Sequence, residues 1–213
     1  MSGFLAVLAA IPITLLVTVG AFIVGFILAL GLVLMRRSKH RWLSFPAQAF
    51  IDLSRGIPPI VWLFFLFFGL SMGAVKLDAL QAGILGLGVV SSGYLAEIFR
   101  GGLLAVHRGQ YEAGEALGLS AWTRYSRIIA PQAFKAMLPA MATYFIGLVK
   151  DSSIASVIGV KEMVFTANQY ARQDAETGIY TFFLAAVIYI AVSIPFAAIA
   201  RRMESRLQEA GAR

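Results

Sequence analysis

The chain has 213 residues, of which 59% are hydrophobic and 14% charged, and its mean hydropathy is +0.79. This composition leaves too little polar surface to cover a water-soluble globule, so we expect an integral membrane protein without a disulfide framework or a cysteine metal site, since cysteine is absent. The net charge of +7 comes from basic clusters beside apolar segments and not from an aromatic-interleaved surface, which argues against nucleic-acid binding.

The first apolar segment extends from Phe4 to Met35, which is longer than the ~20 residues that a spanning helix needs. We expect its first part to lie at the membrane interface and the first spanning helix to cover about 11–35. The segment lacks a basic n-region and exceeds an h-region of roughly 7–15 residues, so it is predicted not to be a signal peptide. A basic cluster at 36–41 follows at once and predicts a cytoplasmic loop.

Four further spanning helices are predicted, and one of them is interrupted. The second helix begins at the pair Pro58-Pro59, which suits a first helical turn. Glycines 83, 86 and 88 predict close contacts between the third helix and its neighbours. The fourth helix is apolar only to Val149, where charged and polar residues interrupt it. After the first span, the expected spans are 58–75, 80–100, 134–160 with a break near 150–153, and 179–200.

Lys and Arg are distributed unequally over the predicted loops. Five lie in the first inner loop, five in the second and four near the C-terminus, against Lys76, Lys161 and Arg172 outside. The positive-inside rule therefore predicts an N-terminus outside and a cytoplasmic C-terminus. We expect an all-α polytopic membrane protein with five transmembrane helices in a single domain over residues 1–213.

One long polar stretch, 107–133, separates the third helix from the fourth. A helix of good formers is predicted from Gln110 to Leu117, ended by Gly118 in a left-handed conformation. Ser120 is placed to cap a second helix over 121–128, which Pro131 is expected to end. Two short helices at an angle, with small residues near their surface, are typical of a docking element for a soluble partner.

The spacing of this stretch resembles the EAA loop of ABC importer permeases, written EAA(x3)G(x9)IxLP. Gly114 stands where that family usually has Ala, and Ala130 where it usually has Leu, and neither change adds bulk or charge. The flanks resemble the polar amino acid permease subfamily from Thr14 to the C-terminal arginines. Its signatures are matched at Arg55-Gly56-Ile57-Pro58, at 92–102, at Arg108-Gly109-Gln110 and at 150–154.

The resemblance implies a type I ABC importer permease in the bacterial cytoplasmic (inner) membrane. It implies a second permease subunit, in a homo- or heterodimer, together with two cytoplasmic ABC ATPase subunits and an extracytoplasmic amino-acid-binding protein. The chain has no GxxxxGK[ST] string, so we expect it to be no enzyme and to hold no cofactor, with ATP and Mg bound by the ATPase. A polar amino acid would be translocated by alternating access, as ATP-driven closure of the ATPase pair moves the coupling loops together.

Two groups of candidate site residues follow. Alone, Glu112 is typical of a solvated acid at a helix start, whereas within the full spacing the resemblance implies that its loop docks into the ATPase subunit. The ATPase-coupling group comprises Glu112, Ala113, Gly114, Gly118, Ile128 and Pro131. The candidate substrate pathway or gate comprises Ser91, Ser92, Tyr94, Glu97, Lys150, Asp151, Ser152 and Ser153.

Lys150 and Asp151 interrupt an apolar run, and an intramembrane charge costs about 2.5–3.5 kcal/mol on translocon scales. Two interpretations are open. The residues either line a substrate path, with Asp151 suited to an ammonium group and Lys150 to a carboxylate, or form a structural ion pair.

Other polar residues support simpler interpretations. Glu97 precedes Arg100 by three residues, a helical spacing that allows an ion pair, so a gate or pairing role is favoured over direct ligand binding. Hydroxyls of the serines at 91 and 92 are expected to bond their own backbone. His40 and His107 lie in basic loops without a second ligand at metal spacing, so we expect no metal site.

Two other classes of function compete with an importer subunit for an amino acid or another small solute. A stand-alone secondary transporter is expected to show inverted repeats, and the sequence shows none. A membrane scaffold that only anchors an enzyme predicts no polar break in the fourth helix.

Overall fold

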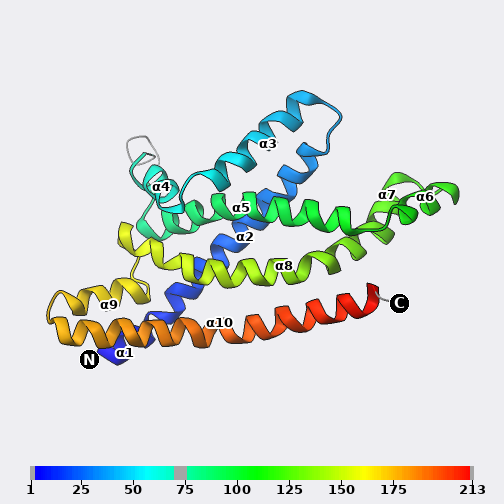
Figure 1. Cartoon of the computed structure of the whole chain (residues 1–213). Coiled ribbons are helices and arrows are strands. Elements are labelled where there is room, and N and C mark those ends of the chain that lie inside the picture. Colours follow the sequence, from blue (N-terminus) through cyan, green and yellow to red (C-terminus); the bar gives the residue numbers. More distant parts are fainter. Residues whose placement is uncertain (1–2, 70–75, 212–213) are drawn as a thin grey trace.

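The computed structural model describes residues 3–69 and 76–211, and every regular element in these ranges is helical (Figure 1). Four stretches of this part are long and apolar enough to cross a membrane, and a bent pair of helices gives a fifth if the pair counts as one span. The elements are α1 (Gly3–Ala9), α2 (Ile11–Arg36), α3 (Arg41–Gly56), α4 (Pro59–Phe64) with the π-helix η1 (Phe65–Gly69), α5 (Ala79–Ala105), α6 (Arg108–Ala116), α7 (Ala121–Arg124) with the π-helix η3 (Tyr125–Ile129), α8 (Ala130–Asp151), the 3₁₀-helix η4 (Ser152–Ile158), α9 (Met163–Ala171) and α10 (Ala175–Gly211).

Helix α5 is the centre of the bundle, and small residues let its neighbours approach closely. A Cβ on Gly88 would meet Val24 of α2, one on Gly86 would meet Leu63 of α4, and one on Gly83 would meet Ala155 of η4. The close contacts predicted for these glycines are therefore present, and each serves a different partner. In Figure 1, α5, α8 and α10 run side by side while α2 crosses them.

The second span differs from the prediction of a loop followed by a helix over 58–75. Residues 41–56 form α3, an amphipathic helix whose Ile51 and Ser54 are buried, and α4 with η1 continues only to Gly69; residues 70–75 lie outside the described part. The two helices meet at 108°. Pro58 forces Ile57 into an extended conformation (φ −92°, ψ 132°), which ends α3. Polar residues on one face of α3 interrupt the apolar run, so the run of apolar residues alone does not indicate this helix.

The fourth span begins earlier than predicted, because Pro131 does not end a helix. The chain stays helical from Ala121 to Ile158, and Pro131 lies just after a change from π-helix to α-helix, a local irregularity that can accommodate a proline. The π-helix η3 directly precedes it. The predicted break at 150–153 is a change of helix type, since α8 ends at Asp151 and the chain continues as 3₁₀-helix to Gly159, which has φ +95°.

The predicted outer loop at 161–178 contains a helix that the sequence analysis missed. Helix α9 packs against α10 and α1, and buried Val7, Met163 and Ala185 form the core between them. Helix α10 is longer than the predicted span of 179–200. Figure 1 shows α1 and α9 at one end of the bundle, and the hairpin of α6 and α7 at the other end, where α10 finishes.

Candidate functional site

The hairpin of α6, α7 and the turn between them, residues 108–124, has well-defined caps. His107 Nδ1 accepts from the Gly109 N–H (3.1 Å) at the start of α6, and Ser120 Oγ accepts from the Thr123 N–H (3.2 Å) at the start of α7. Gly118 has φ +67°, as predicted, and the next N–H, that of Leu119, reaches the Gly114 carbonyl (3.1 Å). A left-handed glycine thus closes α6 and sets the turn.

Side-chain contacts fix the hairpin to itself and to the bundle. A Cβ on Gly114 would lie 3.0 Å from two carbons of Arg124, whose guanidinium also pairs with Glu115 (3.6 Å). Tyr111 donates to the Leu103 carbonyl at the end of α5 (3.2 Å), and its ring meets that of Tyr125 edge-on. The hairpin is therefore held as one body that projects from the bundle.

The six candidate coupling residues occupy three kinds of place. Glu112, Ala113 and Gly118 are exposed on the hairpin, and Glu112 pairs with Arg108 one turn before it (2.9 Å). Gly114 is buried against Arg124, so its small size serves packing within the hairpin and not the outer surface that the sequence analysis expected. Two residues lie in the base: Ile128 packs on the core, and Pro131 lines an apolar groove beside α2 and α5.

Large apolar side chains stand exposed on the hairpin. Leu117 is 75% and Trp122 81% exposed, although most residues of this hairpin are polar or small. Exposed apolar residues on a rigid projection are typical of a surface that another protein covers. Neither residue is among the six candidate coupling residues predicted from the sequence, although Leu117 directly precedes the turn glycine.

At the hairpin end of the bundle, Glu97 of α5 lies between two arginines. Its carboxylate accepts from Arg36 at the end of α2 and pairs with Arg100 (2.8 Å). The spacing to Arg100 predicted one partner; Arg36, far away in the sequence, had been interpreted only as part of an inner basic cluster. The carboxylate therefore ties α2 to α5.

A polar strip runs between α5 and α8. Tyr144 donates to Ser91 Oγ (2.8 Å) and its ring stacks on that of Tyr94, with centroids 5.4 Å apart. Ser92 is buried and donates to the Val89 carbonyl (2.6 Å), as expected for a serine that bonds its own backbone. Tyr144 also lines an open cleft of about 700 Å³ between α5, α8 and Glu204 of α10.

The four residues at the end of α8 point in different ways. Asp151 is half-buried and lies two turns beyond Tyr144 on the same helix face, whereas Lys150 is exposed. No ion pair joins Lys150 to Asp151 within the described ranges, because consecutive helical residues do not face each other. Ser152 and Ser153 donate to the carbonyls of residues 149 and 150, at 2.6 and 2.7 Å.

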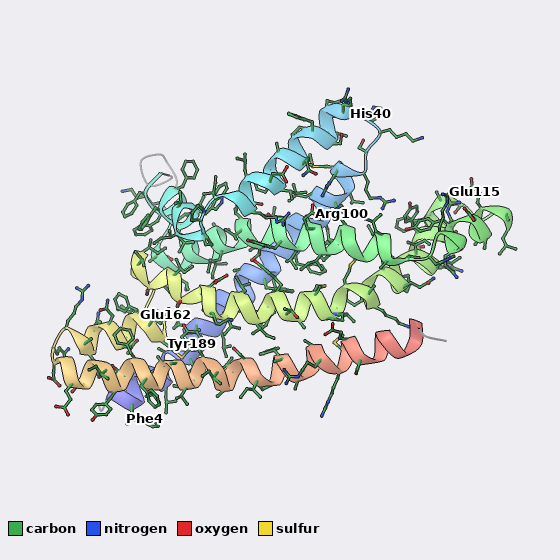
Figure 2. All side chains as sticks on the ribbon, in the orientation of Figure 1. Phe4, His40, Arg100, Glu115, Glu162 and Tyr189 are labelled. Carbon is green, nitrogen blue, oxygen red and sulfur yellow. The ribbon has the colours of Figure 1, made fainter. Side chains whose placement is uncertain are left out.

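A buried carboxylate that the sequence analysis did not single out lies at the α9 end of the bundle. Glu162 is fully buried and caps α9, accepting from the N–H groups of Val164 (2.9 Å) and Phe165 (2.7 Å). Tyr189 of α10 donates to the same carboxylate (2.8 Å), and Figure 2 shows both side chains in the gap between the two helices. The signal available was Glu162 itself, an acid directly before an apolar helix.

Metal ligands do not gather anywhere in residues 3–69 and 76–211, where no group of three His, Cys, Asp or Glu side chains could hold an ion. The exposed His40 ring lies near that of Trp42, with centroids 6.2 Å apart, and His107 caps α6.

The apolar spans around α5 and the projecting hairpin define a multi-pass helical protein of the transport class. Residues 21–209 match the family described as "Binding-protein-dependent transport system inner membrane component", and the chain belongs to that family. It is therefore a multi-pass inner-membrane permease component of the ABC importer type.

Curated relatives span most of the chain. A probable amino-acid permease protein, YxeN of Bacillus subtilis, is 36% identical over 91% of this chain and 87% of its own length. A probable glutamine ABC transporter permease protein, GlnP of the same organism, is 34% identical over 91% of this chain and 90% of its own. The L-cystine transport system permease protein TcyB, also of Bacillus subtilis, is 33% identical over 92% and 82%.

Solved structures show the same fold. An amino acid ABC transporter crystallised with histidines superposes with a TM-score of 0.87 at 31% identity, over 94% of both chains. The MetNI methionine ABC transporter in an inward-facing conformation superposes with a TM-score of 0.76 at 20% identity, over 92% of this chain and 95% of that chain, and this likeness concerns the fold alone.

Proposed function

We propose that this chain is the permease subunit of an ABC importer that moves a polar amino acid across the cytoplasmic membrane by alternating access. Relatives of 33–36% identity whose names specify amino acids support this substrate class. The hairpin of α6 and α7 is the observation that carries the coupling part of the proposal. A cytoplasmic ATPase subunit, which binds ATP and Mg, docks on it.

The hairpin suits force transmission because its contacts continue into the spans. Movement of the hairpin reaches α5 through the bond from Tyr111 of α6 to the Leu103 carbonyl, and reaches α8 through the continuous helix that begins with α7 at Ala121. The exposed Leu117 and Trp122 offer the apolar contact that a stable docking interface needs. A second permease subunit, identical or homologous, completes a dimer with two such hairpins, and an extracytoplasmic binding protein delivers the amino acid.

The polar strip between α5 and α8 is the proposed pathway. Tyr94 and Tyr144 form a stacked aromatic surface. Asp151 supplies a half-buried carboxylate that enters none of the ion pairs of the described chain, so an ammonium group can bind to it. Polar groups at membrane depth that lack structural partners are typical of substrate routes. Glu97, nearer the hairpin end of the bundle, acts as a gate whose state depends on its ion pairs with Arg36 and Arg100.

Hairpin variants test the proposal. Gly118→Val places a β-branched residue at φ +67°, which strains the turn by roughly 1–2 kcal/mol, and Glu112→Lys reverses a charge on the exposed face. Each is expected to lower copurification of the ATPase, or to leave binding-protein-stimulated ATP hydrolysis uncoupled from uptake, while the permease still inserts. Uptake is measured in proteoliposomes with a panel of radiolabelled polar amino acids.

Matched controls separate docking from general damage. Gly118→Asn is expected to keep coupling because Asn tolerates the left-handed region, and Glu176→Lys makes the same charge reversal on an exposed residue at the far end of the bundle. Normal coupled uptake in both Gly118→Val and Glu112→Lys would contradict docking at the hairpin. Failure of every amino acid in the wild-type panel would contradict the substrate class alone.

A further inference from the structure

Arg55 lies at mid-depth in the bundle, in contrast to the inner loop in which the sequence analysis counted it. It is the second-last residue of α3 and packs on α5 at Gly93, where an added Cβ would lie 2.9 Å from Arg55 Cγ. Gly93 stands near the middle of the 27 residues of α5, a candidate membrane span. An arginine at this depth is costly unless it serves a partner or a water-filled route.

The partners of Arg55 within the protein leave its donors available. Its guanidinium lies over the Tyr94 ring, 5.4 Å from the centroid, and it enters none of the ion pairs of the described chain. Asp52, one turn earlier on α3, is held by Gln48 through both carboxylate oxygens (2.8 Å each). A ring face attracts the cation without saturating its five N–H donors.

The surroundings are open and lie against the proposed pathway. Arg55 and Gly56 are exposed, and a Cβ on Gly56 would meet no atom within 4 Å. The Tyr94 ring, over which the Arg55 guanidinium lies, is also stacked on the ring of Tyr144. The break between α3 and α4 thus presents a cation beside the aromatic surface of the strip, as broken helices do in other transport proteins.

We propose that Arg55 binds the carboxylate of the amino acid as it passes the tyrosine pair, and that Lys150 does not. The inference rests on the proposed function and deepens it. The planar guanidinium matches a carboxylate through two parallel N–H···O bonds, a geometry that an ammonium group does not offer. Lys150 is adjacent to Asp151 in sequence and lies on another face of α8, away from the line that joins Asp151 to Tyr144.

The test compares an amino acid with its α-amide, in which a neutral carboxamide replaces the α-carboxylate. The purified permease–ATPase complex, without the binding protein, is titrated with L-glutamine, L-cystine, L-histidine and L-arginine, and the tightest of these is then compared with its own α-amide. The wild-type complex is expected to prefer the acid by about 10- to 100-fold, the worth of a hydrogen-bonded charge. Arg55→Gln is expected to reduce this preference to nearly one, and Arg55→Lys to an intermediate value.

Two further variants make the outcome specific. Arg41→Gln removes an exposed cation at the other end of α3 and is expected to keep the wild-type preference, and thermal unfolding shows whether each complex is folded. An unchanged preference in folded Arg55→Gln, or loss of the preference in Lys150→Gln instead, would overturn the proposal. Absence of binding by all four amino acids counts against the proposed substrate class, which distinguishes the two failures.

Discussion

Carboxylates at different depths of this bundle have different partners. Glu97 receives two arginines from α2 and α5, and Glu162 receives three neutral donors from α9 and α10. Asp151, at the end of α8, is half-buried, and its side chain forms no hydrogen bond or ion pair with a described residue. A carboxylate that no ion pair occupies is available to a ligand, and this difference separates Asp151, the candidate ligand-binding acid, from Glu97, the candidate gate, and from Glu162, which caps a helix.

Asp151→Asn keeps the volume and hydrogen-bonding groups of the side chain and removes its charge. We expect uptake in proteoliposomes to fall about 10- to 100-fold, the worth of a hydrogen bond to a charged group, with the thermal midpoint and ATPase copurification close to wild type.

The structural-pair interpretation makes the opposite prediction for the same variants. If Lys150 and Asp151 compensate each other, each single neutral variant loses roughly 3–5 kcal/mol of stability, and neutralising both residues restores stability and transport. A double variant that regains both properties would therefore rule out a charged pathway at Asp151.

Local spacing made some residue roles predictable from the sequence. The left-handed Gly118, the Ser120 cap and the pair of Glu97 with Arg100 depend on neighbours within a few positions, so the sequence carries the whole signal. Arg36 as a partner of Glu97, and Tyr144 as a partner of Ser91, depend on how helices pack, because 61 and 53 positions separate them. A single sequence does not show which distant residues come into contact when the helices pack.

At the scale of elements, apolar runs located the long spans and failed where polar residues share a helix. The polar residues Gln48, Asp52 and Arg55 of α3 interrupt the apolar run, so hydropathy alone predicts a loop there. Pro131 predicts a helix end because proline normally breaks a helix, yet the π-helix directly before it lets the chain continue as α8.

One buried carboxylate contributes to the contact between α9 and α10 beside its apolar core, which gives a test at the scale of elements. Tyr189→Phe removes one donor to Glu162 and leaves a buried acceptor less well satisfied, so we expect a loss of about 1–3 kcal/mol in the free energy of unfolding. Tyr180→Phe removes a hydroxyl from the same helix at a site that is 65% exposed and is expected to change little. Thermal or denaturant unfolding of the purified complexes measures both.

The pH dependence of stability gives a second readout for this carboxylate. Burial raises the pKa of Glu162 above its ordinary value of 4.5, against the hydrogen bonds that lower it. The folded chain therefore holds this proton more tightly than the unfolded chain, so the group stabilises the fold below pH 4.5 and this contribution is lost as the pH rises through the raised pKa. Glu162→Gln should abolish that part of the profile; an unchanged profile would contradict the assignment.

The two ends of the whole molecule carry different elements. The hairpin, the basic residues at 36–41 and the last turns of α10 lie at one end, and α1, α9 and the start of α10 lie at the other (Figure 1). Moving Arg55 from the inner loop to mid-depth lowers the count of inner basic residues by one and leaves the bias intact. The N-terminus-outside orientation stays a prediction from charge, and it requires the hairpin to be cytoplasmic.

The orientation can be measured directly because the chain has no cysteine of its own. Asp78 and Asp174 cap helices through their carboxylates, so cysteines are better placed at the neighbouring exposed residues Lys76 and Gln173. In cells whose inner membrane is intact but whose outer layers have been removed, an impermeant maleimide is expected to label both cysteines. Cysteines at Lys39 and at Ala116 on the hairpin should react only after the inner membrane is opened, because the basic ends do not cross the membrane. Labelling in the reverse order would place the hairpin outside, where no ATPase could reach it, and would end both the topology and the coupling proposal.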